Sequence, residues 1–159
     1  MTFFHAKQWF ALREMVLSDI PFVLKIENQC QSYPWSKADF ETSISSSHQA
    51  QVLVIEKGTQ STIVAFVITT VVADEAELLN IAVVSDYQRQ GLGKMLLQFV
   101  SESFQDSIHH LYLEVRPSNH KAISLYRALD FHEVGYRPNY YPTKNGREHA
   151  VIMAKNLDY

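Results

Sequence analysis

The sequence contains a single cysteine, Cys30, so no disulfide bond can form within the chain. Disulfide bonds are typical of proteins in oxidising compartments, and their exclusion here favours a reducing compartment. We interpret Cys30 as a small apolar residue near a helix end and not as a catalytic thiol.

Long hydrophobic runs are also missing. No apolar run approaches the roughly eighteen residues that a membrane-spanning helix requires. The N-terminal residues lack the apolar core of a signal peptide. We therefore expect a soluble, cytoplasmic protein.

Positive charge is scarce and dispersed. The chain has 14 Lys and Arg against 17 Asp and Glu, which gives a net charge of −3. Without a basic run the chain does not fit a general nucleic-acid binder, so we expect no direct nucleic-acid partner. A mildly acidic surface suits a cationic partner, but this charge is too small to identify one.

The apolar content is sufficient for one hydrophobic core. Of the 159 residues, 47% are hydrophobic, and we expect one domain over residues 1–159, with residues 1–9 as a possible N-terminal arm. Apolar patterns and turn residues predict strands at 10–16, 51–56, 63–72, 78–84, 108–115, 134–140 and 150–154. Helices are predicted after Asp19, Ser36, Gly91 and Asn119. This order predicts a mixed α/β sheet of six or seven strands with four helices.

A strand that turns through glycines into a helix is the central feature of the sequence. The apolar run 78–84 is followed by Gln88-Arg89-Gln90-Gly91-Leu92-Gly93-Lys94 and then by residues at helical spacing. The first N–H groups of a helix lack intrahelical partners, and the helix dipole adds positive charge there. Glycines leave room for a phosphate to approach those groups. The sequence therefore predicts a pyrophosphate site at this turn.

Other glycine-loop sites fit less well. A Walker loop needs Ser or Thr after its lysine, and Met95 follows Lys94. A dinucleotide-binding loop needs a third glycine, and position 96 is leucine. A tight turn without a ligand remains an alternative, since such loops are common.

Glu114 and Tyr126 are the candidate catalytic residues. Glu114 lies late in an otherwise apolar strand, and Tyr126 lies in the following helix. Transfer of an acyl group from a thioester to an amine needs a base for the ammonium and an acid for the leaving thiolate, tasks that suit a carboxylate and a phenol. The structural alternatives are an exposed glutamate at a strand end and a core tyrosine.

Pro34 and Trp35 lie in a loop between two predicted helices. A tryptophan in such a loop either anchors it in the core or forms an aromatic wall beside a substrate. The residue types alone favour the anchor.

Several motifs together resemble a known family. Asn-Ile-Ala-Val, Tyr-Gln-Arg-Gln-Gly-Leu-Gly-Lys, Leu-Glu-Val-Arg-Pro-Ser-Asn, Ala-Ile-Ser-Leu-Tyr and Arg-Pro-Asn-Tyr-Tyr-Pro-Thr follow one another between about residues 27 and 154. In this order they resemble the RimI-type ribosomal-protein-alanine N-acetyltransferases of the GNAT superfamily. The resemblance implies an α/β (α+β) fold with a mostly antiparallel central sheet flanked by about four helices. It also implies acetyl-CoA as co-substrate without a metal.

The resemblance implies roles for individual residues. Glu114 matches the proton acceptor of the family, and Tyr126 matches its proton donor. The implied cofactor contacts are Ile81, Ala82, Val83, Arg89, Gln90, Gly91, Leu92, Gly93, Lys94 and Asn119. The implied acceptor-binding residues are Pro34, Trp35, Tyr140 and Tyr141.

The implied activity is acetylation of the α-amino group of an N-terminal alanine on a small-subunit ribosomal protein. Two alternatives remain open: the acceptor is a small-molecule amine or a lysine side chain, or the chain is a non-catalytic coenzyme A-binding module. One departure from the family is Asp130, where a glycine is usual. Aspartate tolerates the left-handed conformation common after helices, so we expect a small stability cost.

Overall fold

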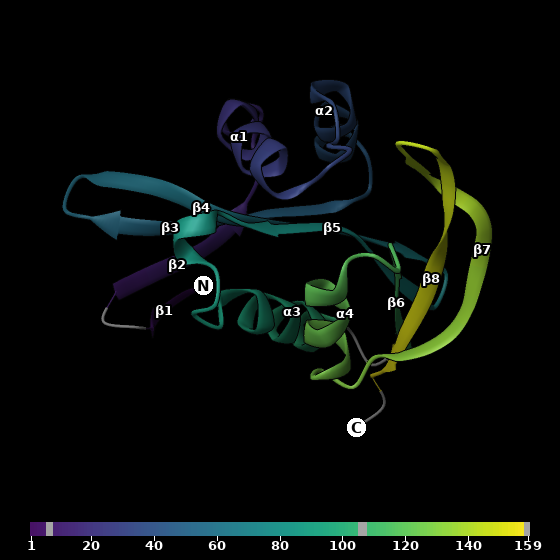
Figure 1. Cartoon of the computed structure of the whole chain (residues 1–159). Coiled ribbons are helices and arrows are strands. Elements are labelled where there is room, and N and C mark those ends of the chain that lie inside the picture. The colour runs from purple at the N-terminus through teal and green to yellow at the C-terminus, as the bar shows by residue number, and fades with distance from the viewer. Residues whose placement is uncertain (6–7, 105–107, 158–159) are drawn as a thin grey trace. The chain divides into compact units, whose positions relative to one another are not determined.

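The computed structural model describes residues 1–5, 8–104 and 108–157 and has the predicted α/β architecture (Figure 1). The helices are α1 (Ile20–Cys30), α2 (Lys37–Ser45), α3 (Leu92–Ser103) and α4 (His120–Arg127), with short 3-10 turns η1 (Leu17–Asp19) and η2 (Ser85–Tyr87). The strands are β1 (Thr2–His5), β2 (Gln8–Glu14), β3 (Gln49–Lys57), β4 (Gln60–Val72), β5 (Glu75–Val83), β6 (His110–Val115), β7 (His132–Thr143) and β8 (Gly146–Asn156). Within the described residues, the strand order in the sheet is β1-β2-β3-β4-β5-β6-β8-β7.

In the part of the chain that the structure describes, the sheet has eight strands, where six or seven were expected. The additional strand is β1, which lies in the stretch considered a possible arm and pairs antiparallel with β2. Met1 and Leu12 exchange hydrogen bonds through their backbones, and the Phe3 ring stacks on Phe10 at 5.5 Å. A strand of four half-exposed residues has too short a pattern for prediction from sequence.

Unit 1 comprises Met1–Thr70 and Asn80–Gly93. Its helices α1 and α2 lie on the same side of β3 and β4 in Figure 1. Helix α1 begins after Asp19, whose carboxylate accepts hydrogen bonds from the Val16 N–H and the Arg13 guanidinium. Helix α2 begins with the predicted capping box, in which Ser36 and Asp39 each bind the other's backbone N–H.

Unit 2 comprises Val71–Leu79 and Lys94–Tyr159. In this unit β6 pairs in parallel with the first half of β5 and antiparallel with β8, which pairs with β7. As predicted, one face of β6 is buried through Leu111, Leu113 and Val115, so Glu114 lies on the opposite face. Asp130 follows α4 with φ +65°, the left-handed conformation that its position predicted.

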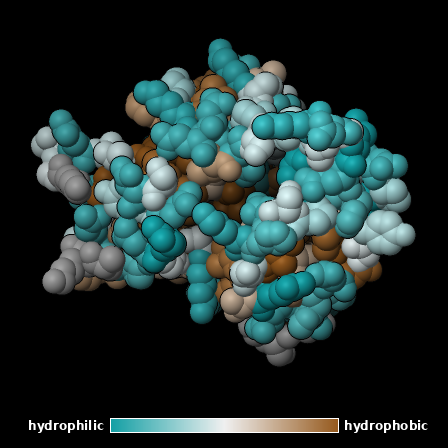
Figure 2. Space-filling view, viewed as in Figure 1, coloured by the Kyte–Doolittle hydropathy of each residue, from teal (hydrophilic) through white to brown (hydrophobic). Residues whose placement is uncertain are grey.

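The face of the molecule in Figure 2 is mainly hydrophilic, with hydrophobic areas between the polar side chains. Among the described residues, no helix is both long enough and apolar enough to cross a membrane.

Candidate functional site

The predicted pyrophosphate loop connects the end of β5 to α3. Its conformation depends on two residues with positive φ, Arg89 at +58° and Gly91 at +83°. The Gln88 amide donates to the Val83 carbonyl at 2.8 Å, and the Gln90 amide donates to the Asp86 carbonyl at 3.1 Å. Glycine suits position 91 because φ near +83° strains any residue with a Cβ.

The loop has the features of an anion site. It leads directly into the N-terminus of α3, a twelve-residue helix whose first N–H groups have no intrahelical acceptor. The side chains of Arg89 and of Lys94, which lies in the first turn of α3, are exposed and cationic. The predicted cofactor contacts Ile81, Ala82 and Val83 are the last three residues of β5, directly before the loop. The residues present therefore fit a diphosphate, although their contacts with it remain a prediction.

Glu114 lies in a cluster of charged and aromatic side chains in unit 2. Its side chain is 13% exposed, and it forms an ion pair with Arg137 of β7. Burial raises the pKa of Tyr140, and the charge of Glu114 together with hydrogen bonding to it raises this pKa further. The Arg137 guanidinium lies 5.5 Å from the Tyr140 ring centre. The structure thus brings together the predicted base and one predicted acceptor-binding residue, and it adds a cation that sequence reasoning missed.

A second carboxylate in this cluster, Glu77, was also missed. Glu77 lies on β5 opposite Tyr112 of β6, one residue before the pair Leu78 and Leu113. Burial raises the pKa of Glu77, and the negative charge of Glu114 raises it further. The alternation along β5 could have indicated a polar residue on the face of Glu114, but single-sequence patterns do not give the register between strands.

Tyr126 is buried in α4, with a side chain packed against Phe131 at a ring distance of 5.8 Å. Burial raises the pKa of Tyr126 far above its ordinary value, and the neighbouring Tyr141 raises it further. The phenol therefore keeps its proton at neutral pH. A protonated hydroxyl is the state that a proton donor needs.

Tyr140 and Tyr141 form an edge-to-face pair with ring centres 4.9 Å apart. The Arg116 guanidinium lies 4.4 Å from the Tyr141 ring centre and forms an ion pair with Glu148. Burial, followed by the charge of Glu114, raises the pKa of Tyr141 to about 12. These contacts fix both rings, which supports but does not test their predicted role in acceptor binding.

Asn119 caps α4, because its Oδ1 atom accepts a hydrogen bond from the Ala122 N–H at 3.2 Å. This is a structural role. The predicted contact of Asn119 with coenzyme A remains a prediction.

The Pro34-Trp35 loop is attached to the buried carboxylate of Glu27, another residue that the sequence did not single out. Glu27 Oε1 accepts hydrogen bonds from the Trp35 N–H at 2.9 Å and from the Asn80 amide at 3.2 Å. The Trp35 ring packs on Phe40 at 5.6 Å and remains partly exposed. Trp35 thus anchors its loop and still presents part of its surface to solvent.

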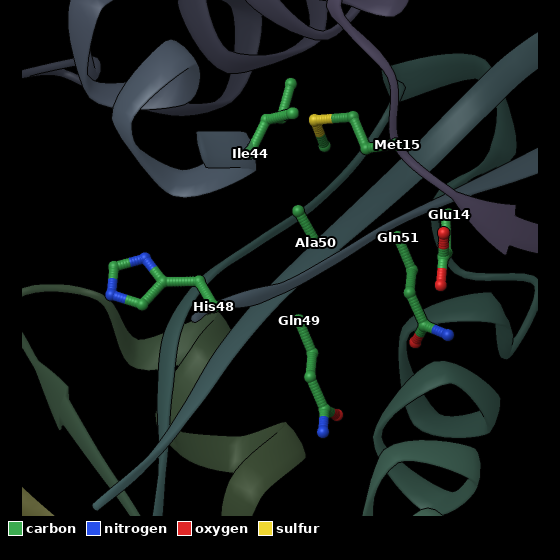
Figure 3. Close-up of a pocket in the computed structure, with 7 residues that line it drawn as sticks. All are labelled: Glu14, Met15, Ile44, His48, Gln49, Ala50 and Gln51. Carbon is green, nitrogen blue, oxygen red and sulfur yellow. The ribbon is translucent and has the colours of Figure 1, made fainter. Parts of the chain in front are cut away.

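A pocket of about 350 Å³ lies elsewhere in unit 1 (Figure 3). Ile44 and Met15 line one side of it, while the Gln49 and Gln51 side chains point away from them. None of its lining residues is among the catalytic, cofactor-binding or acceptor-binding residues predicted from the sequence. Among the described residues there is also no group of three or more His, Cys, Asp or Glu that could hold a metal ion.

The fold and its candidate residues can be compared with known proteins. The model of the Acetyltransferase (GNAT) family matches residues 20–131. A relative from Escherichia coli (strain K12), named ribosomal protein bS18-alanine N-acetyltransferase, is 45% identical over 138 residues, which cover 86% of this chain and 90% of the relative. A relative of the same name from Haemophilus ducreyi is 37% identical over 148 residues, covering 92% and 99% of the two chains.

Solved structures agree with the sequence matches. The crystal structure of the ribosomal-protein-S18-alanine N-acetyltransferase from Escherichia coli has a TM-score of 0.82 and 40% identity, covering 94% of this chain and 95% of that chain. The structure of Arabidopsis thaliana NAA60 in complex with acetyl-CoA has the same TM-score at 17% identity, covering 94% and 99%, and this shows a likeness of fold. The chain is therefore an acetyltransferase that belongs to the GNAT family.

Proposed function

We propose that this enzyme transfers an acetyl group from acetyl-CoA to the α-amino group of an N-terminal alanine on a small-subunit ribosomal protein. The observation that carries the proposal is the 45% identity, over 90% of its length, to a relative named for that reaction on ribosomal protein bS18. A ribosomal acceptor would place the reaction in the cytoplasm.

Acetyl-CoA supplies the acetyl group in activated form, as a thioester. In our proposal its diphosphate binds the N–H groups at the start of α3, where Gly91 keeps the backbone open. Arg89 and Lys94 contribute positive charge. The backbone of 81–83 guides the pantetheine arm, and an N–H near Val83 stabilises the oxyanion that forms on the carbonyl.

Three proton transfers accompany the acyl transfer. Glu114 takes one proton from the α-ammonium through a water, which frees the nitrogen lone pair to attack the carbonyl carbon. A C–N bond forms, the C–S bond breaks, and its electron pair leaves on sulfur. Tyr126 gives its phenolic proton to that sulfur, and the second proton of the attacking nitrogen returns to the Tyr126 oxygen as the amide forms. The cluster around Glu114 supports the first step, because the ion pair with Arg137 holds the Glu114 carboxylate in one orientation.

Acceptor competition tests this proposal. One peptide carries a free N-terminal alanine and an internal lysine, and its matched control has the same sequence with a blocked α-amine. A polyamine serves as the small-molecule acceptor. We expect release of coenzyme A with the first peptide alone. Release with the blocked peptide or the polyamine at the same rate would overturn the acceptor assignment, and coenzyme A binding without any release would favour a non-catalytic module.

A further inference from the structure

We propose that His5 is a positioning residue for the pyrophosphate loop, so that the N-terminal strand β1 forms part of the acetyl-CoA site. His5 Nε2 lies 2.5 Å from the Gln90 carbonyl oxygen, a contact between residues 85 positions apart in the chain. Both residues belong to unit 1. The inference rests on the proposed function, because that function identifies the ligand of the loop.

The contact fixes the protonation of one ring nitrogen. A carbonyl oxygen can only accept a hydrogen bond, so Nε2 must carry the hydrogen and donate it. Both the Nε2–H tautomer and the imidazolium satisfy this requirement.

The same contact fixes the direction of the next N–H group. The peptide bond between Gln90 and Gly91 is trans, because the chain contains no cis peptide bond among its described residues. In a planar trans peptide the C=O and N–H groups point in opposite directions. His5 binds the C=O of Gln90 and thereby turns the N–H of Gly91 away from the imidazole. In the proposal this N–H is one of the groups that bind the diphosphate.

This part of the loop needs such support because the residues on either side of Gln90 both have positive φ. Arg89 at +58° is a residue with a Cβ in the left-handed region, a conformation that is unfavourable for such residues. A Cβ added to Gly91 would lie 3.8 Å from His5 Nε2, an ordinary van der Waals distance. The imidazole therefore packs against the loop as well as binding it, and it opposes rotation of the peptide.

His5 itself is held in place by β1. It is paired with Gln8 in the β1–β2 ladder, and its ring lies 6.4 Å from the Phe10 ring. At the other end of the strand Met1 and Leu12 are joined by two backbone hydrogen bonds. Because the strand is anchored at both ends, the imidazole is already held on Gln90 before the ligand binds. Binding then costs no further loss of side-chain entropy at His5.

The test compares His5→Ala with His5→Gln, whose amide can donate the same hydrogen bond. Phe4→Ala is the matched control, because the neighbouring exposed Phe4 packs on Trp9. The dissociation constants of coenzyme A and of pantetheine, which lacks the diphosphate, are measured by calorimetry. The Michaelis constants of acetyl-CoA and S-acetylpantetheine are measured alongside. Thermal unfolding verifies that each variant is folded.

We expect His5→Ala to weaken coenzyme A binding about 5- to 10-fold, the size expected for one hydrogen bond, with pantetheine binding unchanged. His5→Gln should recover most of the loss, and Phe4→Ala should behave as wild type. Equal coenzyme A affinity in wild type and His5→Ala would overturn the inference, as would an equal loss for both ligands.

Failure of the proposed function gives a different result. If the wild-type enzyme binds coenzyme A but acetylates no N-terminal peptide, the acceptor assignment fails, and the calorimetric comparison still tests His5. If the wild-type enzyme binds no coenzyme A, both proposals are wrong.

Discussion

At the scale of single residues, Glu27 shows how the fold supports the candidate site. Glu27 is 1% exposed, and the Trp35 N–H and the Asn80 amide both donate to the same oxygen, Oε1. The other oxygen, Oε2, is buried without a hydrogen-bond partner among the described residues. Burial raises the pKa of Glu27 above its ordinary value, while the bonds from Trp35 and Asn80 lower it. Glu27 thus joins the Trp35 loop to β5 at the cost of desolvating a carboxylate.

Substitutions of Glu27 separate the hydrogen bonds from the charge. Glu27→Ala leaves the Trp35 N–H and the Asn80 amide unpaired in a buried place, so it should lower the free energy of unfolding by about 1–3 kcal/mol. Glu27→Gln keeps an oxygen for both donors and cannot ionise.

The pH dependence follows from the raised pKa. The folded state holds the Glu27 proton more tightly than the unfolded chain, so the wild-type free energy of unfolding falls as pH rises from 4.5, the ordinary value, through the folded pKa. Urea unfolding should therefore show that the free energy of unfolding of Glu27→Gln rises relative to that of wild type over this pH range. The control Glu102→Gln removes an exposed carboxylate and should show no such gain. Parallel pH curves for Glu27→Gln and wild type would contradict this explanation.

Tyr126 is the predicted proton donor. Tyr126→Phe keeps the buried ring but removes the hydroxyl, so kcat should fall about 100-fold or more, with little change in the KM for acetyl-CoA. Because burial raises its pKa, Tyr126 should add no basic limb to the activity profile near neutral pH. Tyr136→Phe, on an exposed ring of β7, is the control. An unchanged kcat in Tyr126→Phe would remove Tyr126 from the mechanism.

At the scale of elements, local signals predicted well wherever a segment determines its own structure. The Ser36 and Asp39 capping box, the alternation along β6 and the left-handed Asp130 all depend on residues a few positions apart. The Gln-x-x-Gly-x-Gly motif likewise predicted a strand, a turn and a helix in the right order.

The remaining features depend on contacts between distant parts of the chain. The bond between His5 and Gln90 spans 85 positions, and the bond between Glu27 and Asn80 spans 53. Arg137 could not be assigned to Glu114 because β7 and β6 are separated by β8 in the strand order. Periodicity gives the face of a strand but neither its partner nor its register.

Two glycines with positive φ allow the loop to be tested against a matched turn. Gly91→Ala and Gly58→Ala should each lower the free energy of unfolding by about 1–2 kcal/mol, because φ is +83° and +62° at these positions. Only Gly91 lies in the predicted pyrophosphate loop. Gly91→Ala should therefore raise the KM for acetyl-CoA, and Gly58→Ala, in the β3–β4 turn, should leave it unchanged. The same KM in both variants would count against the loop as the diphosphate site.

At the scale of the whole molecule, each unit contains part of the proposed chemistry. The pyrophosphate loop, Trp35 and the buried Glu27 belong to unit 1, and the cluster around Glu114 with Tyr126 belongs to unit 2. β5 and α3 each run from one unit into the other, since the units divide between Leu79 and Asn80 and between Gly93 and Lys94.

The most direct test of the account is to locate the acetyl group on the product. The enzyme is incubated with acetyl-CoA and an alanine-initiated ribosomal peptide that contains a lysine, and fragmentation mass spectrometry identifies the modified nitrogen. We predict one acetyl group on the α-amine of the alanine, and its loss when Glu114→Gln and Tyr126→Phe are combined. An acetyl group on the lysine side chain, or an unmodified peptide with active, coenzyme A-binding enzyme, would contradict the central claim.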